Sequence, residues 1–202
     1  MIPAPEALQR LKSGNQRFTA NLRDAESALD QRRPALSKDH EPFAIILGCS
    51  DARVPAEIVF DQGLGDLFVI RVAGNIVAPS QVGSVEFAAE RFHTRLVVVL
   101  GHSECSAVTT TIEELRRPTE SQSRNLQSIV DRIRPAVQQL MTTDAARDPV
   151  LLHQHAVRAN IRASADHLRH GSAVLEHLIQ EQGLLVVGAE YDLASGVVDF
   201  FD

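Results

Sequence analysis

Residues 96–105 read LVVVLGHSEC, an apolar and largely β-branched run that ends in glycine and is followed by side chains able to bind metal. Residues 43–53 have the same form and read FAIILGCSDAR. Short apolar runs of this kind are typical of strands buried in a parallel sheet, and they predict strands at residues 43–48 and 96–100. Because open α/β sheets bind their ligands at the carboxyl ends of the strands, we expect Cys49, His102 and Cys105 to lie close together.

Helical and strand patterns alternate along the rest of the chain, which predicts an α/β fold. Further strands are expected at residues 66–72, 184–189 and 196–201, and AGN at 73–75 predicts a tight turn. The short connection before the last strand favours an antiparallel edge strand, which needs a cover or a pairing partner. We therefore predict a mostly parallel central sheet, with four parallel strands and one antiparallel edge strand, flanked by helices.

Helices are expected at residues 5–20, from Pro55 for a short distance, and at 79–94, 105–117, 121–141, 147–169 and from the Gly171–Ser172 cap to Gln182. Residues 21–42 are polar and punctuated by proline, and we expect them to run over the surface. Together with the first helix they would form an N-terminal helical arm over about residues 1–42.

Composition limits the domain organisation and the partners. The chain has 202 residues, of which 44% are hydrophobic and 23% charged, and this predicts one domain over residues 1–202. The formal charge of −6 argues against nucleic acid or an anionic membrane as a partner. No secretory signal and no apolar run of about 18 residues is visible. We therefore expect a cytoplasmic protein whose two cysteines stay reduced.

Two thiolates and one imidazole are ligands that zinc prefers. Three protein ligands leave one tetrahedral position open, as in a catalytic zinc site. Residue type alone leaves open that the two cysteines are small hydrophobic core residues. The three-residue spacing of His102 and Cys105, with Cys49 at another strand end, favours the zinc site.

Asp51 and Arg53 follow Cys49 closely, and as a surface ion pair they would contribute only about 0–1 kcal/mol. Beside zinc, Asp51 could accept a hydrogen bond from the metal's water and orient it, while Arg53 keeps the carboxylate ionised and away from the metal. Asp51 could also take the fourth zinc position in a closed, inactive state. We expect low pH to favour that closed state and alkaline pH to favour the Asp51–Arg53 pair.

At these residues the chain resembles the β-class carbonic anhydrases. The resemblance covers CSDARVPAE at 49–57, GDLFVIRVAGN at 65–75 and GHSEC at 101–105, and extends to GNQRF at 14–18 and EYD at 190–192. It implies the β-carbonic anhydrase fold, Zn²⁺ on the Cys-His-Cys set and the Asp-Arg pair as catalytic residues. The implied reaction is the reversible hydration of CO₂ to bicarbonate and a proton by zinc-bound hydroxide, in a homodimer or a dimer of dimers.

The same resemblance implies a substrate pocket that includes Val54, Phe68, Phe87, His40 and Ser106. Three of these differ from the family pattern, since His40 stands for a glutamine, Phe87 for a tyrosine and Ser106 for a glycine. His40 could act as a proton shuttle at the mouth of the site, or it could be an exposed loop histidine.

Other functions remain open at the level of the sequence. A related zinc site could hydrolyse carbonyl sulfide or carbon disulfide, and a zinc-binding sensor could have lost catalysis. A redox protein could use Cys49 and Cys105, but such proteins usually bring their thiols together in a Cys-X-X-Cys motif. The intact Asp51–Arg53 pair favours the hydration of CO₂.

Overall fold

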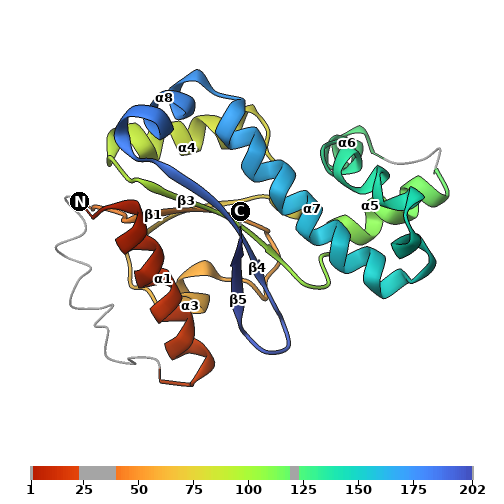
Figure 1. The fold of residues 1–202 in the computed structure, drawn as a ribbon, viewed down its shortest axis with the longest axis horizontal. Coiled ribbons are helices and arrows are strands. Elements are labelled where there is room, and N and C mark those ends of the chain that lie inside the picture. Colours follow the sequence, from red (N-terminus) through yellow and green to blue (C-terminus); the bar gives the residue numbers. More distant parts are fainter. Residues whose placement is uncertain (1, 23–39, 119–122, 202) are drawn as a thin grey trace.

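The computed structural model describes residues 2–22, 40–118 and 123–201, and its centre is a five-stranded sheet (Figure 1). The order of the strands is β2-β1-β3-β4-β5, in which β1 to β4 are parallel and β5 is antiparallel to β4. The strands are β1 (Ala44–Gly48), β2 (Leu67–Arg71), β3 (Leu96–His102), β4 (Leu185–Tyr191) and β5 (Val198–Phe201). The predicted sheet, including its antiparallel edge strand, is confirmed.

Both faces of the central strands are buried, which explains their uninterrupted apolar sequences. In β1, Ile45 and Leu47 face one hydrophobic core, whereas Ala44 and Ile46 face the other. All five residues of β1 and all seven of β3 are buried. Consequently the carboxyl ends of both strands are held rigidly at the same edge of the sheet.

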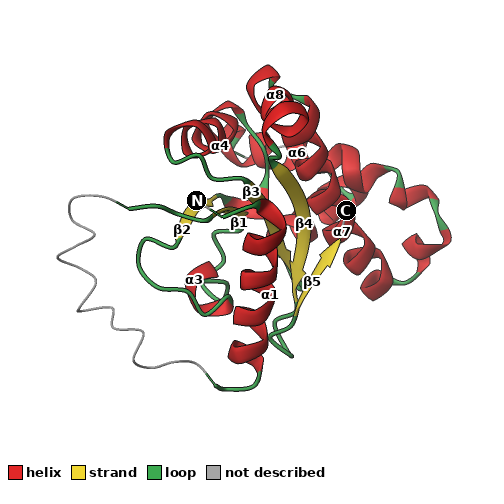
Figure 2. Cartoon of the chain, turned by 60° about the vertical axis from the view of Figure 1, so that its left-hand side comes forward, coloured by secondary structure: helices red, strands yellow, loops and turns green. Residues whose placement is uncertain are grey.

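Helices cover the two faces of the sheet unequally (Figures 1 and 2). Helices α1 and α3 pack on one face, and α4 to α8 contribute to the core on the other. The bounds are α1 (Ala4–Thr19), α3 (Ala56–Val59), α4 (Pro79–Arg91), α5 (Ser106–Arg116), α6 (Arg124–Gln138), α7 (Pro149–His170) and α8 (Ala173–Gln182). Three short 3-10 helices are η1 (Ala73–Asn75), η2 (Leu140–Thr142) and η3 (Asp144–Arg147).

The structure changes some of the predicted boundaries. Strand β3 continues past Leu100 because Gly101 and His102 pair with Glu190 and Tyr191 of β4. His102 is therefore the last residue of a strand. The predicted helix over 121–141 ends at Gln138, and η2 follows it. Of the predicted surface excursion over 21–42, residues 23–39 lie outside the described residues, as do residues 121–122.

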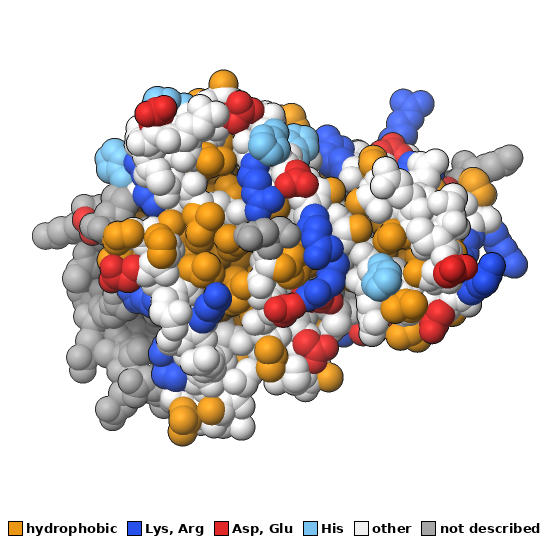
Figure 3. Space-filling view, in the orientation of Figure 1, with side chains coloured by type: hydrophobic (Ala, Val, Ile, Leu, Met, Phe, Trp, Pro, Cys, Tyr) orange, Lys and Arg blue, Asp and Glu red, His pale blue; other side chains and the backbone are white. Residues whose placement is uncertain are grey.

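The edge of the sheet leaves apolar surface on the outside. Leu185 and Phe200 are only partly buried beside α1 and the core on that face. Figure 3 shows hydrophobic side chains over the part of the sheet between α1 and α8, next to positively charged side chains over α7. None of the helices in the described residues has both the length and the hydropathy that a membrane span requires.

Candidate metal centre

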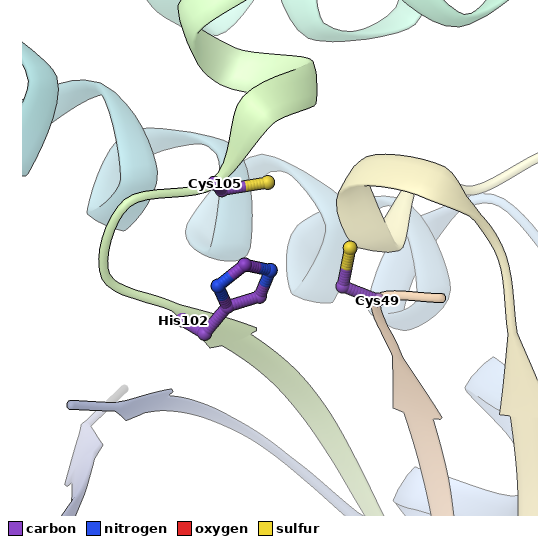
Figure 4. A group of neighbouring side chains, drawn as sticks. All are labelled: Cys49, His102 and Cys105. Carbon is purple, nitrogen blue, oxygen red and sulfur yellow. The ribbon is translucent and has the colours of Figure 1, made fainter. Parts of the chain in front are cut away.

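The three predicted ligands meet at the carboxyl edge of the sheet. Cys49 directly follows β1, His102 ends β3, and Cys105 is the residue before α5. A sharp turn joins the last two, in which Glu104 has a left-handed backbone with φ of 56°. The ligand atoms of all three residues lie within 4.8 Å of one another. Figure 4 shows the two sulfur atoms and the imidazole ring around a common space.

His102 presents one ring nitrogen to that space. Its Nδ1 donates to the carbonyl oxygen of Ser103 at 2.8 Å, which leaves the lone pair of a neutral ring on Nε2. Nε2 is buried and has no hydrogen-bond partner among the described residues. A buried polar atom without a partner is costly unless something else satisfies it. A metal ion bound by Nε2 and the two sulfur atoms would do so, and this donor set fits zinc.

The two thiols have opposite pKa shifts. Cys49 has its pKa lowered from 9.0 to about 4, mainly because the Cys105 thiol donates to its sulfur. His102 and the backbone N–H groups of Gly74 and Asp51 lower it further, against the effect of burial. Cys105 has its pKa raised, because its proton is held in that bond to Cys49 and because it is buried. Near neutral pH the pair therefore has one thiolate, on Cys49, and one thiol, on Cys105.

Burial alone would lower the pKa of His102, but the carbonyl of Ser103 accepts from its ring, and the Cys49 sulfur lies close enough to act as an acceptor when the ring is protonated. These acceptors, together with the negative charges of Cys49 and Asp51, outweigh burial and raise the pKa of His102. A metal ion must therefore displace a proton from this ring at mildly acidic pH.

Asp51 lies beside the metal-binding group and is held by Arg53. The backbone N–H and Nε of Arg53 both donate to Oδ1 of Asp51 at 2.9 Å, and Nη2 donates to Oδ2 at 2.7 Å. The side chain of Arg53 hydrogen-bonds to the carboxylate and holds the pKa of Asp51 well below its usual value, against the effect of burial. The same Oδ2 is 3.9 Å from Nε2 of His102. The carboxylate thus stays ionised at the edge of the site.

Arg71 and Ser103 fix the two ligand-bearing loops. From the end of β2, Arg71 donates through Nε to the carbonyl of Cys49 at 3.1 Å and through Nη2 to that of Asp51 at 2.5 Å. The N–H of Ser103 donates to the carbonyl of Tyr191 at 2.9 Å, and its Oγ accepts from the N–H of Leu193 at 2.9 Å. Neither role could be predicted from the sequence, because these hydrogen bonds join residues that are far apart in the chain.

The predicted pocket residues divide into two groups. Val54 is buried and its N–H donates to the carbonyl of Asp51 at 3.1 Å, and Ser106 is exposed next to Cys105. His40, Phe68 and Phe87 lie elsewhere and form an aromatic cluster with Phe92. The ring centroids in this cluster are 4.6 Å apart for His40 and Phe92, 6.2 Å for Phe68 and Phe87, 6.0 Å for Phe68 and Phe92 and 5.8 Å for Phe87 and Phe92.

The register of the sheet separates this aromatic cluster from the metal-binding group. Phe68 is opposite Ile45, four residues before Cys49, and His40 precedes β1 altogether. At about 3.3 Å per residue, four strand residues span roughly 13 Å. Within one chain, the structure therefore groups these three residues with each other and not with the metal ligands. His40 is exposed, as the loop interpretation expects.

Comparison with known proteins agrees with this arrangement. Residues 44–198 match the family model described as carbonic anhydrase. The chain is 35% identical over 193 residues to a carbonic anhydrase of Mycolicibacterium smegmatis, covering 96% of this chain and 91% of the relative. A carbonic anhydrase of Pseudomonas aeruginosa is 33% identical over 201 residues, covering 92% of this chain and 84% of the relative.

The solved structures that resemble the chain have the same fold. One is from a study of two tetrameric β-carbonic anhydrases of the filamentous ascomycete Sordaria macrospora, with a TM-score of 0.76 and 20% sequence identity. The similarity covers 97% of this chain and 97% of that one. The agreement in fold therefore extends over nearly the whole chain.

Proposed function

This chain belongs to the β-class carbonic anhydrases, and from this premise we propose that Cys49, His102 and Cys105 hold the zinc ion its reaction requires. The reaction is the reversible hydration of CO₂ to bicarbonate and a proton. The observation that carries the ligand assignment is the Cys-His-Cys group within 4.8 Å, in which Nε2 of His102 is buried without another partner.

Zinc, when bound, lowers the pKa of a water molecule and so supplies a nucleophile near neutral pH. Asp51 accepts a hydrogen bond from the attacking water and turns its lone pair toward the carbon of CO₂. Arg53 holds both carboxylate oxygens and keeps Asp51 ionised, so that it remains an acceptor. A closed state in which Asp51 itself binds the metal would first have to break these bonds to Arg53.

Val54 and Ser106 are placed to line the pocket near the ligands, because they adjoin Asp51 and Cys105. Phe68 lies too far along its strand to reach the metal ligands of its own chain, and His40 and Phe87 belong to the same aromatic cluster. If they contribute to a pocket, they do so across a contact between two copies. The side chains of the aromatic cluster support such a contact, since Phe87 is 53% exposed.

The assembly is a homodimer or a dimer of dimers. Two features support self-association: the exposed ring of Phe87 and the edge strand β5, which among the described residues pairs with a strand on one side only. The structurally similar Sordaria macrospora enzymes are described as tetrameric. Symmetric association is the usual form of oligomers built from one kind of chain.

Metal analysis and stopped-flow CO₂ hydration test the assignment together. The wild type should carry about one zinc per chain and hydrate CO₂. His102→Asn should lose most of both, whereas His155→Asn, which changes an exposed histidine of α7, should keep them. Asp51→Asn should keep its zinc and lose roughly 10–100-fold in kcat/KM.

The alternatives give different results in the same assays. A wild type that holds zinc but hydrates no CO₂ would support the silent zinc sensor. Turnover of carbonyl sulfide or carbon disulfide without CO₂ hydration would move the assignment to that hydrolase class. A reduced protein without stoichiometric zinc would contradict the ligand assignment and favour the redox function.

A further inference from the structure

The turn after β2 reaches the sulfur of Cys49. The backbone N–H of Gly74 donates to Sγ of Cys49 at 3.4 Å, in a buried position. Two successive residues of this turn have left-handed backbones, since φ is 69° at Gly74 and 43° at Asn75. A left-handed asparagine is tolerated but not strongly preferred, so the turn depends on contacts from outside to hold this shape.

Helix α7 supplies these contacts from the opposite side. Nδ2 of Asn160 donates to the carbonyl of Gly74 at 2.8 Å, and Oγ of Ser164 donates to the carbonyl of Asn75 at 3.0 Å. Asn160 is 2% exposed and Ser164 is 5% exposed. Residues four apart on a helix share a face, so one face of α7 binds two consecutive carbonyls of the turn.

Helices α5 and α6 pack closely against the turn at Gly74. A Cβ atom at Gly74 would lie 2.8 Å from Cδ1 of Ile133 and 3.0 Å from Cβ of Ala107. The packing of α5 and α6 therefore presses on one side of Gly74, and Asn160 holds its carbonyl from α7. With both constraints in place, the N–H of Gly74 points toward the sulfur of Cys49.

We propose that Asn160 is a positioning residue of the metal site, which holds Gly74 so that its backbone N–H donates to the Cys49 sulfur. Ser164 supports it by holding the next carbonyl. This inference rests on the proposed role of Cys49 as a zinc ligand. A hydrogen bond to a thiolate stabilises its charged form and reduces the electron density that it gives to a metal. Asn160 thus affects the electron density on the Cys49 sulfur without contacting it.

Two readouts on Asn160→Ala test this, and neither is enzymatic activity. The first is the zinc dissociation constant, measured by competition with a chromophoric chelator. The second is the thiolate-to-metal charge-transfer band of the cobalt-substituted protein, which reports the electron density on sulfur. We expect the dissociation constant to rise roughly tenfold, because Gly74 no longer holds Cys49 in position, and the band to move to lower energy, because the sulfur then gives more electron density to the metal.

Asn15→Ala is the matched control. Asn15 is 5% exposed and donates through Nδ2 to the carbonyls of Val59 at 3.1 Å and Gly196 at 2.9 Å, on the other face of the sheet. Its replacement should lower the stability against urea, as replacement of Asn160 should, but leave zinc affinity and the cobalt band unchanged. If Asn160 had only a structural role, both variants would lose stability and neither would change the zinc affinity or the cobalt band.

Unchanged zinc affinity and an unchanged band in Asn160→Ala would overturn the proposal, as would equal changes in Asn15→Ala. If Asn160→Ala does not fold, Ser164→Ala provides the test with a smaller disturbance, and it should shift the band in the same direction. No shift in Ser164→Ala would then overturn the proposal. A wild type that shows no cobalt–thiolate band contradicts the ligand assignment itself and so separates the two failures.

Discussion

At the scale of single residues, the protonation states of the three metal-binding side chains depend on one another. The pKa of Cys49 is lowered to about 4, so this thiol is ionised at neutral pH. Cys105 keeps its proton, because it is bonded to the Cys49 sulfur and buried. The pKa of His102 is raised, so its ring also holds a proton as the solution becomes acidic. Zinc needs two thiolates and a neutral imidazole, and must therefore displace protons.

Zinc affinity should accordingly rise with pH. In the metal-free protein the raised pKa of Cys105 keeps a proton bound, and in the zinc complex that proton is gone. Binding then releases about one proton or more per zinc near neutral pH, so higher pH favours the complex. Calorimetric titration in buffers of different ionisation enthalpy measures the number released. Zinc affinity that is constant from about pH 6 to pH 8 would contradict these protonation states.

At the scale of elements, α1 is attached to the sheet by a close backbone contact. A Cβ atom at Gly14 would lie 1.8 Å from the carbonyl oxygen of Phe60, the residue after α3. The next residue, Asn15, bonds to Val59 and Gly196 and also accepts from the N–H of Val198 at 2.9 Å. One turn of α1 thus fixes its distance from both α3 and the β4–β5 hairpin.

Gly14→Ala should therefore destabilise the protein, although alanine is the better helix former. The methyl group has no space without moving α1 away from Phe60, and overpacking of this kind costs about 1–3 kcal/mol in the free energy of unfolding. Urea denaturation measures the change. Gln16→Ala, at an exposed position of the same helix, should stay within about 0.5 kcal/mol of wild type. Equal stability of the two variants would mean that α1 does not approach so closely.

At the scale of the whole molecule, the metal-binding group lies at the carboxyl end of the parallel strands, and the aromatic cluster lies toward their amino end. The group follows the carboxyl ends of β1 and β3, whereas Phe68 lies near the start of β2, and His40 precedes β1. Among the described residues, the aromatic cluster therefore forms partly exposed apolar surface. A contact between copies would cover it.

Phe87→Ser should weaken that assembly. Removing an exposed aromatic anchor from an interface typically costs about 1–3 kcal/mol, which corresponds to roughly a tenfold or larger rise in the dissociation constant between copies. Sedimentation equilibrium measures it. Val150→Ser removes another exposed apolar side chain, 66% exposed at the start of α7, and should leave the assembly unchanged. An unchanged mass distribution for Phe87→Ser would place the contact elsewhere.

Much of this protein follows from short stretches of sequence. The apolar runs ending at Gly48 and Gly101 determine two buried parallel strands, because only a strand covered on both faces has no polar side of its own. The strand ends then determine that Cys49, His102 and Cys105 meet, because parallel strands finish at one edge of the sheet. The exact ends of strands could not be predicted, since β3 reaches His102 through pairing with Tyr191 of β4.

The tertiary structure alone decided what surrounds that centre. Arg71 holds the carbonyls of Cys49 and Asp51, and Asn160 holds Gly74 from a position 86 residues away in the chain. The sheet register places Phe68 opposite Ile45 and so keeps it away from the metal ligands of its own chain. Hydrophobic periodicity records which face of an element is buried. It does not record which distant side chain is packed against that face, and the environment of the metal ligands is set by such contacts.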